Sequence, residues 1–307
     1  MKVVVFGASG FIGSHVVSSL FQAKHNVTAV VRPTSDASFL EEQGIHVVRV
    51  NYNDLSQISA AMKSQDIVYN CTASTKALSK NGGNAIEISL TKVLVDVALN
   101  EGVHHFVQLS SITIYGFEKE GIIDEDYQPL IKTPTQILQQ EREKVVINAG
   151  KTKKMVTTIV RPASTIGERG EHSFFAKMFE LNQTGEFPIV GRGAARTSFI
   201  DTRDIGQAMT LIGEKKLAGI YLVKGFDATW IQVKNTMDNI MGQKTNYKHI
   251  PETTDKQNMQ SYEYKTFATT RVWNDLQIRE QGFYPRYSLQ QAAEKEIYYL
   301  KSIIENR

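Results

Sequence analysis

The sequence predicts an α/β protein with a doubly wound parallel sheet and a smaller lobe toward the C-terminus. Three observations lead to this prediction. Short apolar runs alternate with amphipathic stretches of helical length through the first half of the chain. Most of these runs are apolar at successive positions, as strands buried on both faces of a sheet are. The first run also leads directly into a glycine-rich turn and then a helix.

Six strands and five helices are expected in this first half. The expected strands are 3–6, 27–31, 46–50, 67–71, 103–109 and 155–161, and the expected helices are 12–22, 35–43, 55–63, 85–100 and 136–148. Strand–helix–strand units of this length form right-handed crossovers, which place parallel strands in one sheet with helices on both faces. The predicted architecture is therefore a Rossmann fold.

The glycine-rich turn, Gly7-Ala-Ser-Gly10-Phe-Ile-Gly13, joins the first strand to the first helix. Glycine is needed where the chain turns with positive φ, where backbone approaches phosphate, and where a helix packs closely on a strand. The free N–H groups and positive dipole end of the helix favour a pyrophosphate. We therefore expect this turn to bind a nicotinamide dinucleotide rather than to be only structural. The expected contacts are Gly7, Ser9, Gly10, Phe11, Ile12 and Gly13.

The end of the second strand bears on the choice between NAD and NADP. Sites that prefer NAD place an acidic residue about twenty residues after the glycine turn, where it holds the ribose 2′-hydroxyl. Here the chain reads Val30-Val31-Arg32-Pro33, without an acid. A guanidinium suits a 2′-phosphate by its charge and its fork of donors. We expect NADP, with NAD less favoured, although Arg32 as a solvated residue at the strand end is the alternative.

After Arg161 and Pro162 the alternation of strands and helices stops. The elements expected beyond this point are a helix over 173–181, a glycine-bearing loop over 185–196, a strand near Phe199, a helix from Thr202, a strand over 220–223, and helices over 229–241 and 287–305. Ser288 and Gln291 form a capping-box pattern at the last helix. We expect residues 1–165, with about 198–225, to form the dinucleotide-binding domain. Residues 166–197 and 226–307 are expected to form the substrate-binding lobe.

Composition excludes several classes of function. The net charge of +3 is spread over 307 residues, without the basic runs of a nucleic-acid surface. The single cysteine, Cys71, rules out an internal disulfide and a cysteine-rich metal site, and it suits a reducing compartment. No segment reaches the roughly 18 apolar residues of a membrane span. We expect a cytoplasmic protein with a small-molecule substrate, and no metal, nucleic-acid or membrane partner.

Six segments together resemble the short-chain dehydrogenase/reductase superfamily, in its extended, epimerase/dehydratase-like branch. They are GASGFIG at 7–13, NYND at 51–54, DIVYNCTAS at 66–74, HHFVQLSSITIYG at 104–116, RPASTIG at 161–167 and PIVGRGAARTSFIDTRDIGQAM at 188–209. The Val-Arg-Pro end of the second strand is most similar to dihydroflavonol-reductase-like and steroid-dehydrogenase-like members, many of which use NADP. The resemblance implies a homodimer through the helices that begin near Ala85 and Gln136.

The resemblance also implies further site residues. Cofactor contacts are implied for Arg32, Asn51, Tyr52, Thr72, Ala73, Arg161 and Pro162, and substrate contacts for Tyr115, Arg192 and Arg196. For Tyr115 the alternative role is packing under its loop. A plain turn explains the glycines around Arg192 and Arg196 but not the two arginines, so both an anion-binding role and a turn stay open.

The superfamily oxidises or reduces a carbon–oxygen centre with a tyrosine, a lysine four residues later, a serine or threonine, and an asparagine. Ser111 matches the serine. Aligning Pro134 and Glu143 with the family pattern puts Thr135 at the tyrosine position and Gln139 at the lysine position. A threonine hydroxyl has a far higher pKa than tyrosine, and neutral Gln139 cannot lower it. The usual proton relay should therefore lose the ~10²–10⁴-fold that general acid–base catalysis contributes.

Glu87 stands at the asparagine position, and Asn51 stands where the family has an acid beside the adenine. If it were desolvated, Glu87 could serve as an acid or base, but a solvated helix face is the plainer expectation. Two functions follow from these substitutions. The first is an NAD(P)-dependent oxidoreductase or epimerase/dehydratase, acting on a small carbonyl or hydroxyl compound or a nucleotide-sugar through a non-standard site. The alternative is a catalytically inactive, NADP-binding redox sensor or regulatory scaffold. The full second lobe favours the enzyme.

Overall fold

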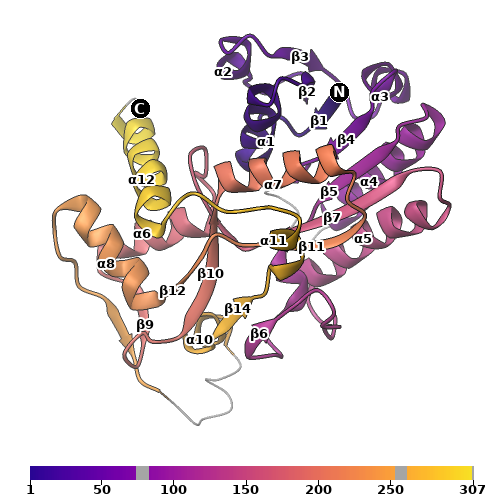
Figure 1. Ribbon diagram of the computed structural model, residues 1–307. Helices are drawn as coiled ribbons and strands as arrows, with labels where there is room; N and C mark the ends of the chain where they lie inside the picture. Colours follow the sequence, from indigo (N-terminus) through magenta and orange to yellow (C-terminus); the bar gives the residue numbers. More distant parts are fainter. Residues whose placement is uncertain (74–82, 253–260, 306–307) are drawn as a thin grey trace.

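A seven-stranded parallel sheet forms the centre of the N-terminal part of the molecule in the computed structural model (Figure 1). The described residues are 1–73, 83–252 and 261–305. The strand order is β11-β7-β5-β4-β1-β2-β3. The strands are β1 (Lys2–Phe6), β2 (Asn26–Val31), β3 (His46–Arg49), β4 (Ile67–Asn70), β5 (His105–Leu109), β7 (Val156–Pro162) and β11 (Gly219–Val223). The predicted Rossmann fold is confirmed, and its switch point for ligands lies between β1 and β4.

Helices cover both faces of this sheet. One face carries α1 (Phe11–Gln22) and α7 (Thr202–Lys215), and the other carries α3 (Leu55–Met62), α4 (Gly83–Asn100) and α5 (Pro134–Lys151). In β1, Val3 and Val5 pack with the first group of helices, whereas Val4 and Phe6 pack with the second. Because both faces are buried, most positions of these strands are apolar, which is why they read as near-continuous runs; Gln108 of β5 and Arg161 of β7 are buried polar exceptions.

The helices α1 and α7 pack unusually closely. A Cβ at Gly206 would lie 2.5 Å from the His15 carbonyl oxygen, so only glycine permits this approach. The second half of the chain thereby contributes α7 and β11 to the N-terminal core. The short helix α2 (Ser38–Glu41) completes this side, and it is shorter than the predicted 35–43.

A second sheet lies in the C-terminal part, and the sequence did not predict it as a sheet. Its order is β12-β10-β14-β6, with β8 pairing to β10. The strands are β6 (Gly121–Ile123), β8 (Ser164–Ile166), β10 (Arg196–Asp201), β12 (Phe226–Thr229) and β14 (Arg271–Trp273), and β9 (Pro188–Val190) pairs separately with β13 (Lys248–Ile250). Three-residue strands carry too little periodicity to be recognised.

Helices surround this second sheet and share a separate apolar core with it. They are α6 (Phe174–Thr184), α8 (Trp230–Met241), α10 (Tyr262–Ala268) and α12 (Leu289–Glu305), whereas α11 (Leu276–Glu280) buries Ile278 in the core of the N-terminal sheet. The core includes Phe187, Trp230 and Phe267. The predicted capping box before α12 is confirmed, since Ser288 N–H donates to Gln291 Oε1 and Gln291 N–H donates to Ser288 Oγ.

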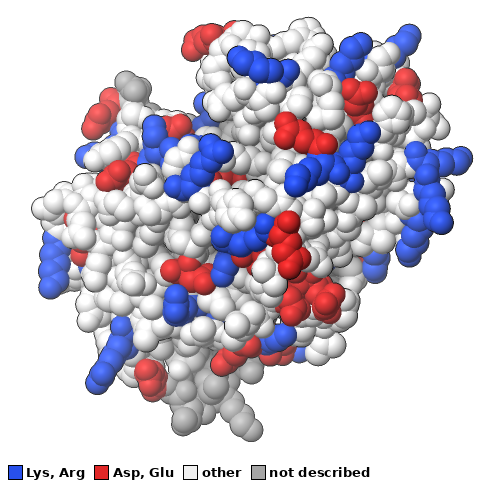
Figure 2. Space-filling view, viewed as in Figure 1, with Lys and Arg blue, Asp and Glu red and all other residues white. Residues whose placement is uncertain are grey.

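The surface carries basic and acidic side chains interspersed over the visible face (Figure 2). Among the described helices, none is both long enough and apolar enough to cross a membrane.

Candidate functional site

The turn from Gly7 to Gly13 is packed so tightly that no side chain fits at Gly7 or at Gly13. A Cβ at Gly13 would lie 2.1 Å from the Gly7 carbonyl oxygen, and one at Gly7 would lie 2.8 Å from the Cys71 carbonyl carbon and oxygen. Gly7 also has a φ of 76°. Gly10 is the N-cap of α1, and no side chain caps the helix. The first turn of α1 thus presents backbone N–H groups to an approaching anion.

Tyr52 contacts this turn through its hydroxyl group. Its hydroxyl accepts a hydrogen bond of 3.2 Å from the Gly7 N–H, and its ring lies 6.1 Å from that of Phe6. Burial raises the pKa of Tyr52 to about 12, so the hydroxyl stays protonated. Asn51 is exposed beside it, and Arg32 is exposed directly after β2. The predicted adenosine-side residues therefore gather at the ends of β2 and β3.

The ends of β4 and β5 complete this edge of the sheet. Thr72 follows β4 and donates its hydroxyl hydrogen to Asn70 Oδ1 at 2.7 Å, and Ala73 is exposed after it. Ser111 follows β5 and is the N-cap of η1 (Ile112–Tyr115), where its Oγ accepts from the Thr113 N–H at 3.1 Å. Within the described residues the Ser111 hydroxyl donates to no group. It is partly exposed and can donate to a ligand oxygen.

Thr135 and Gln139 lie on the first turns of α5, which packs against η1. Both are partly exposed. Ser110 Oγ lies 3.4 Å from Gln139 Oε1 but 2.5 Å from Glu143 Oε1, so the carboxylate takes its hydrogen bond. Neither Thr135 nor Gln139 carries a charge. The two residues predicted to stand at the family tyrosine and lysine positions are therefore neutral, and Gln139 lies next to Ser110.

A buried ion pair joins α5 to β7 directly behind these positions. Arg161 is 6% exposed and donates from Nε and Nη2 to the two oxygens of Glu143, at 3.0 and 2.6 Å. Its Nη1 donates to the Tyr115 hydroxyl at 2.7 Å. The predicted cofactor residue Arg161 is thus engaged inside the protein, as is its buried neighbour Pro162.

Tyr115 is fully buried in this cluster. Its ring stacks on Trp273 at 5.3 Å and on Tyr127 at 6.2 Å. Burial raises the pKa of Tyr115 to about 12, against the opposing effect of the Arg161 charge. The ring therefore packs under its loop, the role weighed above against substrate contact, and it leaves no surface open to a substrate.

A second buried ion pair corrects the expectation for Glu87. This residue is 6% exposed rather than solvated, and its Oε2 lies 3.3 Å from Arg142 Nη1. Arg142 Nε also donates to Thr91 Oγ1 at 3.0 Å, and its Nη2 donates to the Thr72 carbonyl at 2.8 Å. The expectation was wrong because α4 and α5 pack their facing sides together, which buries the acid against a cation. One guanidinium thereby ties both helices to the end of β4.

Sequence reasoning missed Arg142. The available signal was the acid at Glu87, because a carboxylate at a position that faces another helix requires a buried cation nearby. The consequence reaches the cofactor turn. Arg142 holds the carbonyl of Thr72, and the backbone of Cys71 and Thr72 is what closes against Gly7.

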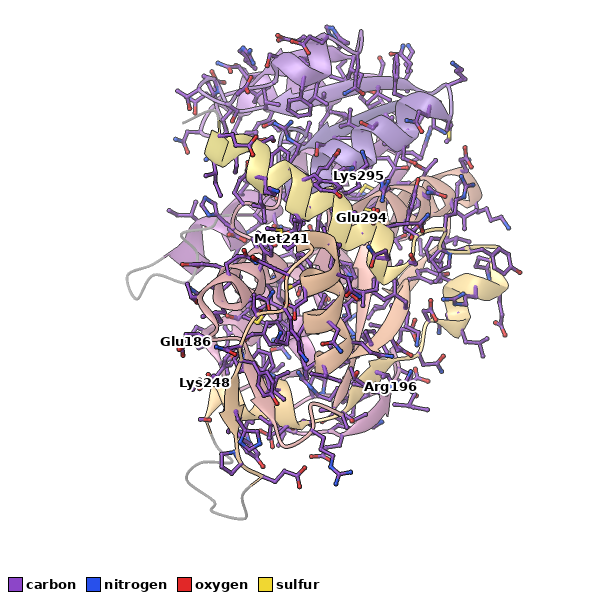
Figure 3. All side chains as sticks on the ribbon, turned by 90° about the vertical axis from the view of Figure 1, so that its left-hand side faces the viewer. Glu186, Arg196, Met241, Lys248, Glu294 and Lys295 are labelled. Atoms are coloured by element: carbon purple, nitrogen blue, oxygen red, sulfur yellow. The ribbon has the colours of Figure 1, made fainter. Side chains whose placement is uncertain are left out.

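Arg192 and Arg196 are both exposed and belong to the C-terminal part rather than to the seven-stranded sheet. Arg192 lies in the connection from β9 to β10, where Gly191 and Gly193 have φ values of 54° and 67°, and Arg196 begins β10. In Figure 3, Arg196 lies in the C-terminal part of the molecule, on the opposite side of α12 from the helices of the N-terminal sheet. In the described ranges, no three histidine, cysteine or acidic side chains lie close enough together to hold a metal ion.

The sequence matches the family model for the NAD dependent epimerase/dehydratase family over residues 3–223. Among curated proteins, an uncharacterised UDP-glucose epimerase of Bacillus subtilis is 22% identical, over 99% of this chain and 99% of that protein. A dTDP-glucose 4,6-dehydratase of Actinoplanes sp. is 23% identical, over 76% of this chain and 79% of its own length.

Solved structures share the fold. The UDP-glucuronic acid 4-epimerase of Bacillus cereus, in complex with NAD, superimposes with a TM-score of 0.82 at 19% identity, covering 100% of this chain and 98% of that one. The UDP-glucose 4-epimerase of Stenotrophomonas maltophila, with NAD and formylated UDP-arabinopyranose, gives 0.83 at 18% identity, covering 100% of both chains.

Proposed function

The chain belongs to the NAD dependent epimerase/dehydratase family, and from that premise we propose that it is an enzyme acting on a nucleotide-sugar with a bound nicotinamide dinucleotide. The reaction is oxidation or reduction at a carbon–oxygen centre, within an epimerase or dehydratase step. The relatives named for UDP- and dTDP-linked sugars support this substrate class. A small carbonyl or hydroxyl compound is the second candidate.

The glycine turn is the single observation that carries the proposal. A turn in which Gly13 and Gly7 exclude every side chain, ahead of a helix that no side chain caps, fits the pyrophosphate of a dinucleotide. Such packing is compatible with backbone N–H groups as the ligands of the phosphate. The residues proposed to hold the cofactor are Gly7, Ser9, Gly10, Phe11, Ile12 and Gly13, with Thr72 and Ala73 at the next strand.

We propose NADP as the cofactor, on the charge at the end of β2. Arg32 is exposed there, and it stands directly after Val31, where an acid would hold a free 2′-hydroxyl. A guanidinium beside the adenosine ribose favours a 2′-phosphate. The two structures described above contain NAD. NAD is therefore the alternative cofactor for this chain.

The site chemistry differs from a tyrosine–lysine relay. The cofactor supplies hydride transfer when bound. Ser111 is proposed to donate its hydroxyl hydrogen to the substrate oxygen, since its Oγ is otherwise only an acceptor. The amide nitrogen of Gln139 donates to no group in the described part of the chain, so it is available to a ribose hydroxyl. Without a cation here, proton transfer is slow relative to a complete relay.

The two parts of the molecule are proposed to bind different ligands. Residues 1–165 with about 198–225 would hold the cofactor, and 166–197 with 226–307 would enclose the substrate. A homodimer through α4 and α5 is also proposed. Ile86 and Ile137 are large apolar side chains exposed on these helices, 72% and 45%.

Turnover tests the proposed enzyme. Purified protein is incubated with NADP⁺ or NAD⁺ and UDP-glucose, UDP-glucuronic acid or dTDP-glucose, and the sugar products are followed by NMR. We expect slow conversion of at least one nucleotide-sugar, abolished in Ser111→Ala. Saturable cofactor binding without conversion of any of these sugars, or of a panel of small carbonyl and hydroxyl compounds, would instead support the sensor function.

Cofactor preference has its own test. Arg32→Ala should weaken NADPH binding by about tenfold and leave NADH binding unchanged, because only NADPH carries the 2′-phosphate. Fluorescence titration with both cofactors measures this directly. Equal affinity of the unmodified protein for NADH and NADPH would contradict the NADP proposal.

A further inference from the structure

Arg271 is a partly exposed cation without a carboxylate partner in the part of the chain that the structure describes. It begins β14, between β10 and β6, and in the described ranges no acidic side chain lies within ion-pair distance of it. Its Nη1 donates to the Gly116 carbonyl, and its guanidinium carbon lies 3.9 Å above the Phe117 ring. Burial lowers the pKa of Arg271 to about 10, so the side chain keeps its charge at neutral pH.

Two buried donors without acceptors stand next to each other on this strand. Arg271 Nε and Trp273 Nε1 are both shut off from solvent, and neither has a hydrogen-bond partner among the described residues. Residues two apart on a strand share a face, and the guanidinium carbon lies 6.0 Å from the Trp273 ring. Buried donors are nearly always satisfied, so a neighbouring pair without acceptors indicates a missing acceptor group.

The same face adjoins the candidate reacting centre. Trp273 stacks on Tyr115, which ends the short helix that Ser111 caps. Gly116 and Phe117, the two contacts of Arg271, follow Tyr115 directly in the chain. Across the strand pair, Arg271 is opposite Gly121, where an added Cβ would meet nothing within 4 Å. The space beside Gly121 therefore adjoins Arg271, whose contacts Gly116 and Phe117 follow Ser111 shortly after in the chain.

We propose that Arg271 and Trp273 form an anchor for an anionic oxygen of the substrate, either a phosphate or a carboxylate. The Nε–Nη2 edge of a guanidinium matches both groups with two parallel hydrogen bonds, and this edge of Arg271 is unused. The indole N–H adds a donor on the same face. The inference rests on the proposed function, because it assigns the charged end of that substrate.

A purely structural role accounts for part of this arrangement. The stacking of Arg271 on Phe117 is a favourable cation–π contact by itself. It requires no free guanidinium edge, however, and it does not explain the unpaired indole of Trp273. A structural arginine would usually be neutralised by one of the acids that supply ion pairs elsewhere in the chain, as Arg161 is by Glu143.

The test follows the Trp273 indole in solution. The chain has two tryptophans, so a ¹⁵N-labelled sample gives two indole N–H signals, and Trp230→Phe identifies them. Trp230 Nε1 already donates to the Thr266 carbonyl at 3.1 Å and serves as the internal reference. UDP-glucose, UDP-glucuronic acid and inorganic pyrophosphate are added in turn, with dissociation constants measured by calorimetry. The variants are Arg271→Met, Arg271→Lys and the exposed control Arg286→Met, which removes the same charge.

We expect the Trp273 signal to shift downfield on ligand binding while the Trp230 signal stays in place. Arg271→Met should weaken binding by about 10- to 100-fold, the effect of losing a charged hydrogen bond, and Arg271→Lys should recover only part of it. Arg286→Met should change little. If Arg271→Met weakens only UDP-glucuronic acid, the anchored group is the carboxylate. Equal losses for both sugars and for pyrophosphate identify a phosphate.

The contrary results separate this inference from the proposed function. Tight binding of a UDP-sugar with unchanged affinity in Arg271→Met, and with no shift of Trp273, would overturn the anchor and leave the enzyme proposal standing. Pyrophosphate binding that depends on Arg271, without any UDP-sugar binding, would support the anchor and contradict the substrate class. If none of the three ligands binds, both proposals fail.

Discussion

The turn at Gly7–Gly13 and the helix pair α4–α5 adjoin the same end of the sheet, but the turn acts through its backbone and the helix pair through its side chains. The turn works through backbone, and its packing distances of 2.1 and 2.8 Å leave no room for a side chain. The helix pair works through side chains, among them Glu87, Thr135 and Gln139, which are predicted to stand where the family has its polar catalytic groups. Cofactor binding is thus fixed by the fold, whereas the acid–base chemistry depends on residues that the fold does not constrain.

The helix pair α4–α5 does contain buried charged side chains, but they are held in ion pairs. Two arginines and two glutamates form the buried pairs Arg142–Glu87 and Arg161–Glu143. Each positive charge is matched by a carboxylate within 3.3 Å. The pairs stabilise the packing of α5 against its neighbours, but they offer no free cation that would lower the pKa of a hydroxyl beside the cofactor.

The largest effect is expected from restoring the relay. Thr135→Tyr combined with Gln139→Lys should raise turnover by about 10²–10⁴-fold, because a lysine lowers the pKa of the neighbouring tyrosine hydroxyl. Steady-state rates with NADP⁺ and the best nucleotide-sugar measure the gain.

Thr135→Phe with Gln139→Met is the matched control, since it fills similar volume without acid–base groups. An equal gain in the control would show that packing limits the wild-type rate. No gain in Thr135→Tyr with Gln139→Lys would contradict the position assigned to these residues.

Removing one member of a buried ion pair should strongly lower the free energy of unfolding. Arg142→Met leaves the buried Glu87 without its guanidinium, and we expect a loss of about 3–5 kcal/mol in the free energy of unfolding. Adding Glu87→Gln should recover most of this loss. Denaturant unfolding of the wild-type protein and the two variants measures both effects.

The same variants test whether the helix pair α4–α5 affects cofactor binding at the glycine turn. Arg142 binds the Thr72 carbonyl, so Arg142→Met with Glu87→Gln should bind NADPH more weakly than wild type even where stability is recovered. Unchanged affinity in this double variant would show that the cofactor turn is independent of α5.

The turn also has a neighbour from the C-terminal part. Glu296 of α12 is fully buried, and its carboxylate accepts hydrogen bonds from the Gly167 N–H at 2.7 Å and from the Ser173 hydroxyl. A Cβ at Gly170 would lie 2.9 Å from Glu296 Oε1 and 2.9 Å from the Phe11 ring. The loop between β8 and α6 therefore bridges α12 and the cofactor turn.

Burial raises the pKa of Glu296 to about 8, from an ordinary value near 4.5, with Asp201 adding to the increase. The folded state then binds this proton more tightly than the unfolded state. Its contribution to stability is complete below about pH 4.5 and is lost as pH rises through about 8. Unfolding free energies measured from pH 5 to 9 should fall with pH.

Glu296→Gln should remove this part of the pH dependence, and Glu294→Gln, on a partly exposed residue of the same helix (Figure 3), should not. The same slope in wild type and Glu296→Gln would assign the pH dependence to other groups.

The features that could be predicted from the sequence are those that local residues determine, and the features that depend on contacts between distant segments could not be predicted. The glycine turn and the parallel strands were predictable because local residues determine them: three glycines at fixed spacing, and runs such as Val3–Phe6 that are buried on both sides. The sheet formed by β6 and β14 was not, because each strand has three residues and pairs across a long stretch of chain. The Glu87–Arg142 pair depends on how α4 meets α5, so reading Glu87 from its own helix gave a solvated face.

We expect the turn to bind a dinucleotide independently of the catalytic groups, and Gly10→Ala tests this most directly. Gly10 has a φ of −78°, and an added Cβ would meet only the Gly7 carbonyl oxygen, at 3.2 Å, so the variant should fold. The methyl group would stand where phosphate approaches. In NADPH titrations we predict saturable binding by wild type and at least about tenfold weaker binding by Gly10→Ala, with unfolding changed by about 1 kcal/mol or less. Equal affinities in the two proteins, or no saturable binding by wild type, would contradict the account.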